Sequence, residues 1–368
     1  MTQRLSPSLT PLDIALAALL RGLDPVAPIE VPLVDALGCI ASEMSAVAAC
    51  PAHDVAAVDG WAMLANDLVG ASSYSPLPLH KPPVWVEAGD VMPEGSDCVL
   101  DVDAVDTSGP ITEVLAEGVP GQGVRRAGSD IARGATAAAA GCPVGAADLL
   151  LARAVGLEAL RVRRPRLHIV NVPGATVTAG MIMESGRAAG AQVTMVEAKT
   201  RDATSIADVL DATTCDLLLL IGGSGGGRHD AAVTAMARRG EVLAHGIALQ
   251  PGRTTALGRL DGVPVVALPG SPDQALAAWL ALVLPTLDRL SARLTRKSLT
   301  LPLARKIASS VGLAEIALLA EENRLWLPLA AGELPLQAIV RADAWLLING
   351  NGEGFAAGAP VDAYLMPE

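Results

Sequence analysis

The stretch LLLLIGGSGGGRHD, from Leu217 to Asp230, places an apolar run directly before a loop of five glycines and one serine. A short aliphatic run bounded by glycines is typical of a strand buried on both faces, and such strands occur in parallel sheets. The segment that follows, DAAVTAMARRG, has helical periodicity. The chain around this loop is therefore predicted to fold as strand, tight turn and helix, which is the repeating unit of an α/β sheet.

The same alternation continues on both sides of the loop, over residues 164–290. It predicts an α/β fold with a central doubly wound, mostly parallel sheet and helices on both faces. Ligands on such sheets bind beyond the carboxyl ends of the strands, and the glycine-rich turns after Ile221 and Leu268 are expected there. The other segments of this pattern are the strands RLHIVNV and VPVVAL, the helix and strand of GMIMESGRAAGAQVTMV, and the long helix SPDQALAAWLALVLPTLDRL, which is expected to bend or end near Pro285.

Three other regions flank this domain. Residues 1–46 and 142–163 have helical periodicity, and a helix is predicted over Ser8–Leu23, with Thr10 as its N-cap and Pro11 at its first position. Residues 47–141 contain short β-like pieces between Gly, Pro and Asp turns, which predicts a β-rich insertion. Residues 291–368 carry RLWLPLA, DAWLLING and VDAYLM, which predict a small β-barrel or sandwich.

The composition excludes several functional classes. The net charge of −12 argues against a large nucleic-acid-binding surface. No apolar run approaches the roughly 18 residues of a membrane span, and the N-terminal stretch lacks the features of a signal peptide. Five cysteines without CxxC spacing favour reduced thiols over a zinc site. We therefore expect a cytoplasmic protein that binds neither nucleic acid nor membrane.

The glycine loop, Gly222 to Gly227, has two interpretations. It is not a P-loop, because Arg228 and His229 stand where Lys and Ser or Thr belong, and it contains no dinucleotide fingerprint. One interpretation is a tight connection between strand and helix. The other is an anion site, because glycines let backbone N–H groups approach a ligand and a helix N-terminus favours negative charge. Asp230 either caps the helix or binds a cation.

Two proline-glycine turns follow the glycine loop along the chain. In LQPGRTTALG, Arg253 follows Pro251 and Gly252, and a guanidinium suits the oxygens of phosphate or molybdate. Taken alone, an arginine such as Arg253 is more often a solvated surface residue. In LPGSP, Ser271 lies between a strand end and a helix start, which is a second anion site of the same kind.

These segments resemble motifs of the MoeA family, the molybdopterin molybdenumtransferases that include the gephyrin E domain. PAHDVAAVDGWAM resembles P-x-x-x-x-S-x-x-DG-Y-A, with Asp59 at its acidic position, and RRAGSDIARG resembles R-x-G-x-D-I-x-x-G, with Asp130. GGSGGGRHD resembles GG-x-S-x-G-x-x-D, LQPGRTTALG resembles K-PGKP-x-x-x-G, and LPGSP resembles LPGNP. The five segments agree with the family in order and spacing over essentially the whole chain.

The resemblance implies a homodimer held through residues 1–46 and 142–163, with an active cleft between the α/β domain of one subunit and the β-rich lid of the other. It implies insertion of molybdate into molybdopterin, with release of AMP from the adenylylated form and with Mg²⁺ or another divalent cation assisting. A molybdopterin adenylyltransferase or an apo-molybdoenzyme is an expected partner. The implied catalytic residues are Asp59, Asp130, Asp230 and Arg253, of which Asp130 and Asp230 bind the cation. The implied cofactor-binding residues are Gly222, Gly223, Ser224, Gly225, Gly226, Gly227, Pro251, Gly252, Pro269, Gly270 and Ser271.

The chain also departs from the family pattern. Gly174 and Ala175 replace the two acids of S-T-G-D-E-L. Gly225 replaces a serine, Gln250 and Arg253 replace two lysines, and Ser271 replaces an asparagine. The lost charges weaken metal and oxyanion binding, which leaves two hypotheses: a divergent molybdenumtransferase, or a catalytically degenerate protein that binds molybdopterin or delivers the molybdenum cofactor to a partner enzyme. Each acid also has a structural interpretation, as a turn residue or a helix cap.

Overall fold

The computed structural model describes residues 8–366, which fall into two units. One unit contains Met1–Glu43, Ala139–Gly145 and Ala159–Glu368; the other contains Met44–Ala138 and Ala146–Glu158. The finer division into four regions stays a prediction.

Among residues 8–366, no helix has both the length and the apolar character that a membrane span needs. All five cysteines are free thiols, and burial raises the pKa of Cys98 and Cys215 to about 11.

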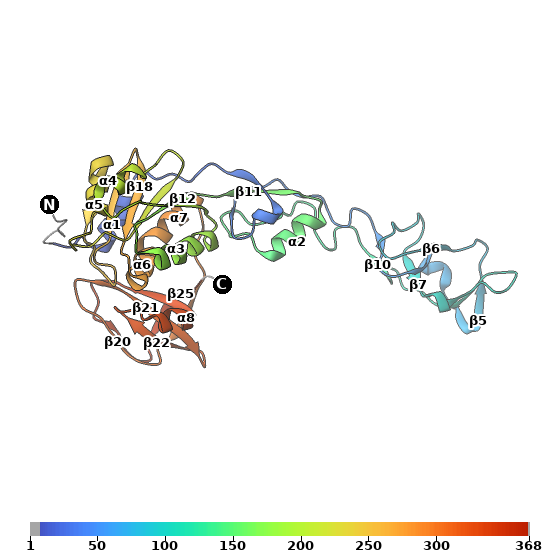
Figure 1. Cartoon of the computed structure of the whole chain (residues 1–368). Helices are drawn as coiled ribbons and strands as arrows, with labels where there is room; N and C mark the ends of the chain where they lie inside the picture. The colour runs from blue at the N-terminus through green and yellow to red at the C-terminus, as the bar shows by residue number, and fades with distance from the viewer. Residues whose placement is uncertain (1–7, 367–368) are drawn as a thin grey trace. The chain divides into compact units, whose positions relative to one another are not determined.

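A six-stranded sheet forms the centre of the first unit (Figure 1). Four strands run parallel in the order β13 (Gln192–Glu197), β12 (Arg166–Asn171), β14 (Leu217–Ile221) and β18 (Val263–Leu268). The predicted mostly parallel sheet is thereby confirmed. Two antiparallel strands, β17 (Ala256–Leu260) and β15 (Glu241–His245), extend it beyond β18, although their sequences were not predicted to form strands.

Helices cover both faces of this sheet, because successive side chains of a strand point to opposite faces. Leu217, Leu219 and Ile221 of β14 pack in one core cluster, while Leu218 and Leu220 pack in another. Figure 1 shows α3 and α6 on one side of the sheet and α4 and α5 on the other. The helices are α3 (Thr176–Ala188), α4 (Ala203–Asp208), α5 (Ala232–Arg239), α6 (Pro272–Ala278) and α7 (Leu284–Ser291).

The long helix after β18 is interrupted where the sequence predicts a bend. A π-helical turn, η4 (Trp279–Val283), separates α6 from α7, and Pro285 is near the start of α7. Because proline has no N–H and its ring clashes with the preceding turn, a regular α-helix cannot continue unchanged through this position. Every residue of η4 is buried, so this turn lies in the core.

The N-terminal helix is shorter than predicted. Helix α1 covers Leu12–Leu20, and Pro11 occupies its N-cap position without a side-chain cap. The interpretation of Thr10 as N-cap is wrong, because its backbone forms a β-bridge with Ile247. This pairing, which joins segments far apart in the chain, outweighs a local capping preference.

The helical prediction for residues 142–163 is wrong beyond Ala154. Helix α2 covers Ala146–Ala154 in the second unit, but ALRVR forms a strand, β11 (Ala159–Arg163), in the first. Strand β11 is the centre of a three-stranded sheet with β1 (Ile29–Pro32) and β2 (Ile40–Ala41), and a 3₁₀ turn, η1 (Leu33–Asp35), follows β1.

The second unit is β-rich, as predicted. Its core contains Met63, Leu68, Leu100 and Val114, all buried. It consists of three small sheets, β3 (Val55–Ala56) with β10 (Val124–Arg125), β4 (Gly60–Met63) between β6 (Val84–Val86) and β7 (Cys98–Leu100), and β9 (Glu113–Ala116) between β5 (Ser72–Pro78) and β8 (Val105–Asp106), together with the 3₁₀ turns η2 (Ala65–Leu68) and η3 (Val102–Ala104).

The C-terminal region of the first unit forms a second six-stranded sheet that curls strongly. Leu303, just after β19, forms a bridge with Trp326 in β22, so the two ends of the sheet approach each other. The sheet also extends into the α/β domain, because β21 pairs with β16. Its elements are β16 (Leu249–Gln250), β19 (Ser298–Pro302), β21 (Ala314–Glu322), β22 (Leu325–Ala331), β23 (Ala344–Ile348) and β25 (Pro360–Leu365), beside the pair β20 (Ile307–Ala308) and β24 (Gly354–Phe355) and helix α8 (Leu336–Arg341).

Candidate functional site

Three loops at the carboxyl ends of β12, β14 and β18 surround one cavity of about 280 Å³, which we call the glycine-loop cavity. Parallel strands end at the same edge of a sheet, so loops far apart in the chain meet there. The residues lining this cavity are Val172, Gly174, Ala175, Arg201, Gly222, Gly223, Ser224, Gly225, Asp230, Thr254, Pro269, Gly270, Ser271 and Gln274.

Two glycines of the loop are required by backbone conformation. Gly222 has a φ of 91° and Gly223 a φ of 71°, in the left-handed region that other residues rarely adopt. The loops also approach closely, because a Cβ atom on Gly270 would lie 3.4 Å from Cα of Gly222. Side chains at these positions would fill the space where the three loops meet.

The glycine loop is fixed from two sides. Nε2 of His245, at the end of β15, lies 2.9 Å from the carbonyl oxygen of Ser224. The N–H of Gly227 donates to Oδ2 of Asp230 at 2.9 Å. The interpretation of Asp230 as the cap of the following helix is wrong, because Ala231 is the N-cap of α5 and no side chain caps it. Asp230 instead closes the loop that precedes the helix.

Ser224 lines the cavity, and its hydroxyl is buried. The residue is only 1% exposed, and its Oγ has no hydrogen-bond partner within residues 8–366. A buried hydroxyl without a partner is costly, which is why such groups in native proteins often serve a ligand. The glycine motif predicted Ser224 as a site residue. No sequence pattern indicates that its hydroxyl lacks a hydrogen-bond partner among the described residues.

Arg201 also lines the cavity, and the sequence interpretation missed it. Its Nη2 lies 3.4 Å from Oδ1 of Asp230, and its Nη1 donates to the carbonyl of Pro173 at 3.1 Å. Arg201 follows β13, the parallel neighbour of β12, so the same rule about strand ends applies to it. The only sequence signal was an arginine soon after a predicted strand.

The loop that carries Arg201 is held by a helix cap. Oδ1 of Asp202 accepts hydrogen bonds from the N–H groups of Thr204 and Ser205, at 2.9 and 3.1 Å, and so caps α4. The hydroxyl of Thr200 donates to the other carboxylate oxygen. This hydroxyl bond, followed by the backbone bonds, lowers the pKa of Asp202. The cap therefore limits the positions available to Arg201.

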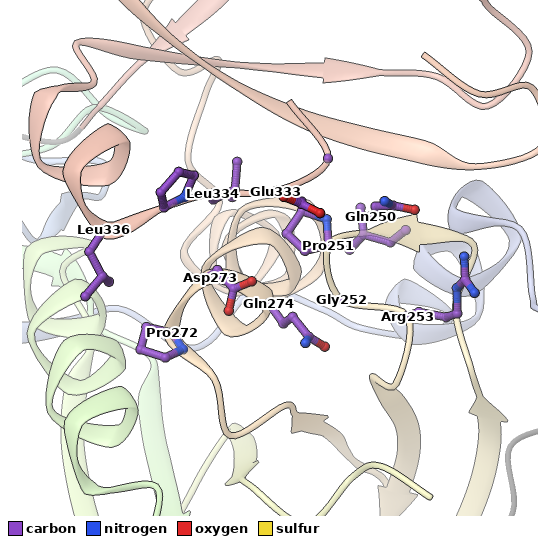
Figure 2. A pocket seen from close by; sticks show the side chains of 13 residues that line it. Gln250, Pro251, Gly252, Arg253, Pro272, Asp273, Gln274, Glu333, Leu334 and Leu336 are labelled. Carbon is purple, nitrogen blue, oxygen red and sulfur yellow. The ribbon is translucent and has the colours of Figure 1, made fainter. Parts of the chain in front are cut away.

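A second cavity, of about 690 Å³, lies beside Arg253, and we call it the Arg253 cavity. Figure 2 shows Asp273 and Gln274 projecting from the start of α6, opposite Glu333 and Leu334. Gln274 lines both cavities, so they adjoin. The predicted residues Pro251, Gly252 and Arg253 line this second cavity, whereas Pro269, Gly270 and Ser271 line the first.

Comparison with known proteins agrees with this arrangement. Residues 10–156 match the family described as MoeA N-terminal region (domain I and II), and residues 172–289 match the one described as probable molybdopterin binding domain. Molybdopterin molybdenumtransferase 2 of Mycobacterium tuberculosis is 31% identical over 304 residues, which cover 71% of this chain and 74% of that protein. The chain belongs to the MoeA family.

Two further proteins match over nearly the full length. A putative molybdopterin biosynthesis protein of Methanocaldococcus jannaschii is 24% identical, with 92% of each chain covered. The crystal structure of a molybdopterin biosynthesis MoeA protein from Pyrococcus horikoshii superposes with a TM-score of 0.73 at 25% identity, covering 97% of this chain and 99% of that one. The fold class predicted from the sequence is thereby confirmed.

The two remaining acids of the MoeA motifs lie in the second unit. Oδ1 of Asp59 accepts the N–H of Ala88 at 2.7 Å. Oδ2 of Asp130 forms an exposed ion pair with Arg125 at 3.3 Å. Gly226 and Gly227 are not among the residues that line the glycine-loop cavity. The roles of Asp59, Asp130 and these two glycines stay predictions.

The residues around the glycine-loop cavity do not fit Mg²⁺ well. Within residues 8–366, no group of three or more His, Cys, Asp or Glu side chains could hold a metal ion. Asp230 is the acid that lines this cavity, and both of its oxygens already have partners, on Gly227 and Arg201. Mg²⁺ needs several oxygen ligands, and a guanidinium beside the carboxylate competes for the same charge.

Proposed function

We propose that this protein is a molybdopterin molybdenumtransferase of molybdenum cofactor biosynthesis, which inserts molybdate into molybdopterin and releases AMP from the adenylylated form. The observation that carries the proposal is the glycine-loop cavity, where the predicted residues Gly222, Gly223 and Ser224 meet Gly270 and Ser271. Its similarity to the M. tuberculosis molybdopterin molybdenumtransferase supports the same activity.

The two adjoining cavities suit two parts of the reaction. The glycine-loop cavity offers the hydroxyl of Ser224 and the guanidinium of Arg201 to the phosphate of an adenylylated ligand. The larger Arg253 cavity offers a guanidinium suited to the oxygens of molybdate. Holding both reactants side by side lowers the entropic part of the barrier to their reaction. Gln274, which lines both cavities, lies where the two ligands would meet.

The second hypothesis is a protein that binds or delivers the cofactor without transferring molybdenum. Gly174 and Ala175 favour it, because they line the glycine-loop cavity where the family carries acids. A cavity with fewer acids still binds an anionic pterin ligand but offers less to a cation. The apo-molybdoenzyme that receives the cofactor would then be the partner.

One assay distinguishes the two hypotheses. Purified protein is incubated with adenylylated molybdopterin and molybdate, with and without Mg²⁺, while AMP release and formation of active cofactor are measured. Molybdate-dependent release of AMP together with active cofactor supports the transferase. Binding without AMP release supports the delivery protein. Binding of neither pterin form contradicts both.

A matched pair of variants links the reaction to the Arg253 cavity. R253Q should reduce molybdate-dependent AMP release by about tenfold or more, because it removes a charge-assisted contact to an oxyanion. R324Q removes an equal charge from an exposed turn between β21 and β22 and should leave the rate unchanged. Equal rates for R253Q and wild type would show that molybdate does not bind at Arg253.

The implied homodimer is also part of this proposal. Asp59 and Asp130 would then act from the lid of the neighbouring subunit. Light scattering on the purified full chain measures the mass directly, and a monomer at working concentration would contradict the shared cleft. Mixing two impaired variants, D59N and R253Q, tests it further, because mixed dimers should recover part of the lost activity.

A further inference from the structure

The guanidinium of Arg201 lines the glycine-loop cavity, where the family motifs predict a bound divalent cation. Arg201 contacts Pro173, directly before Gly174 and Ala175. A Cβ atom on Gly174 would lie 3.1 Å from Nη1 of Arg201, so the guanidinium occupies space next to a position without a side chain. The substitution of the acidic turn and the presence of Arg201 are therefore connected in space.

Arg201 has capacity left for a ligand. Its contacts with Pro173 and Asp230 use two of the five N–H groups of a guanidinium. Its side chain is 44% exposed, and the ion pair with Asp230 is long, at 3.4 Å. Such a pair is weak in water, so the guanidinium can turn toward a phosphoryl oxygen at little cost.

The other walls of the cavity add donors suited to the same anion. The buried Oγ of Ser224 has no partner among the described residues and can donate to an oxygen. Asp230 is the opposing charge, and Gly227 already holds one of its oxygens. An anion that enters therefore meets the guanidinium of Arg201, beside Ser224, while the carboxylate of Asp230 is directed at the loop.

We infer that Arg201 binds a phosphoryl group in this cavity and supplies the positive charge that a divalent cation would otherwise provide. Phosphate binding by this chain is accordingly independent of Mg²⁺. The inference deepens the proposed function, on which it rests for the identity of the whole ligand, but the phosphate contact is testable by itself. A guanidinium pairs with phosphate through two parallel hydrogen bonds, which also orients the ligand.

The test is titration of the full chain with inorganic phosphate by calorimetry, once in EDTA and once in excess Mg²⁺. Wild type should bind equally under both conditions. R201Q should bind about tenfold more weakly, because it loses a charge-assisted contact. The phosphate affinity of R201K should lie between those of wild type and R201Q, since lysine keeps the charge but lacks the planar guanidinium. R187Q, which removes an exposed charge from α3, is the matched control and should bind like wild type.

D230N supplies a test in the opposite direction. Asparagine keeps an oxygen for the N–H of Gly227 but removes the charge that pairs with Arg201. Phosphate should therefore bind several-fold more tightly. Weaker binding by D230N would overturn the inference, because it would give the carboxylate a direct part in holding the ligand or a cation. Thermal unfolding of each variant verifies that the fold is retained.

Three further results would overturn the inference: phosphate binding by wild type only with Mg²⁺, full affinity in R201Q, or no phosphate binding under either condition. Failure of the proposed function looks different. A protein that binds phosphate through Arg201 but neither form of molybdopterin would disprove the proposed function and leave the inference standing. A protein that binds molybdopterin but never phosphate would do the reverse.

Discussion

Nε2 of His245 lies 2.9 Å from the carbonyl oxygen of Ser224, so a strand on the antiparallel side of the sheet holds the glycine loop. A carbonyl only accepts, and therefore Nε2 carries the proton. The loop after β14 contains five glycines and would lose much conformational entropy on ordering. His245 reduces the motion that this loop retains in the folded protein.

H245A should therefore loosen the glycine loop. Loss of one half-buried hydrogen bond is expected to lower the free energy of unfolding by about 1 kcal/mol. Urea denaturation measures this change, and hydrogen exchange should be faster at residues 223–227. H229A, at an exposed position on the same loop, is the control and should alter neither. Unchanged exchange in H245A would mean that the loop is held by its other contacts alone.

G225S should displace Asp230. A Cβ atom on Gly225 would lie 2.6 Å from Oδ2 of Asp230, which is closer than real contacts allow, so the carboxylate must rotate away from Gly227. The expected cost is about 1 kcal/mol of unfolding free energy, that of one hydrogen bond. Thermal or urea unfolding provides the measurement.

G180A is the matched control for that substitution. Gly180 lies within α3, and a Cβ atom there meets nothing within 4 Å. Alanine should raise the free energy of unfolding by roughly 0.5–1 kcal/mol, because it restricts the unfolded chain and favours the helix. If G225S were as stable as wild type, the carboxylate would not be confined as the structure describes.

His168 should make stability depend on pH. Burial lowers its pKa below the ordinary value of 6.5, although Asp211 acts in the opposite direction. Because the folded protein binds this proton less readily than the unfolded chain, stability is fully present above pH 6.5 and is lost as pH falls through the lowered pKa. H168Q should flatten this part of the curve of unfolding free energy against pH.

The control is H80Q, at an exposed position in the second unit, which should leave the curve unchanged. In the folded protein, Nδ1 of His168 lies 2.8 Å from Oγ1 of Thr194 on the neighbouring strand. A wild-type curve that stays flat between about pH 5 and 7 would show that protonated His168 is tolerated in this sheet.

Arg296 should be required mainly to neutralise Asp288. Its Nε donates to Oδ2 of Asp288 at 2.7 Å and its Nη2 donates to Oδ1, with both side chains mostly buried. Burial raises the pKa of Asp288 despite this partner. R296M should cost about 3 kcal/mol at neutral pH, because it removes the hydrogen-bonded partner of a mostly buried carboxylate and leaves only the charge of Arg293 to act on it.

The pH dependence of R296M tests this explanation. A buried acid whose pKa is raised in the folded protein lowers the free energy of unfolding as pH rises. The difference in unfolding free energy between R296M and wild type should therefore be smallest at acidic pH. The double variant D288N/R296M should recover much of the loss at neutral pH. Denaturant unfolding at several pH values measures both effects, and a deficit in R296M that does not change with pH would contradict the explanation.

The strands and the glycine turns of the central domain were predictable because their cause is local. Apolar runs such as Leu217–Ile221 are long enough to identify a buried strand, and glycines mark its end. The antiparallel strands β15 and β17 were missed, because short and mixed sequences such as EVLAH carry little periodicity. Thr10 was misassigned for a related reason: its partner, Ile247, is distant in the chain.

By itself, the sequence determined the α/β class, the β-rich second unit, and the residues that make the glycine-loop turns. Only the tertiary structure decided which of these residues share a cavity, because local sequence patterns do not determine the order of the strands in a sheet. The position of β13 beside β12 brings Arg201 to Asp230 and Gly174. Asp230 likewise closes the glycine loop and does not cap the following helix, since its carboxylate accepts the N–H of Gly227.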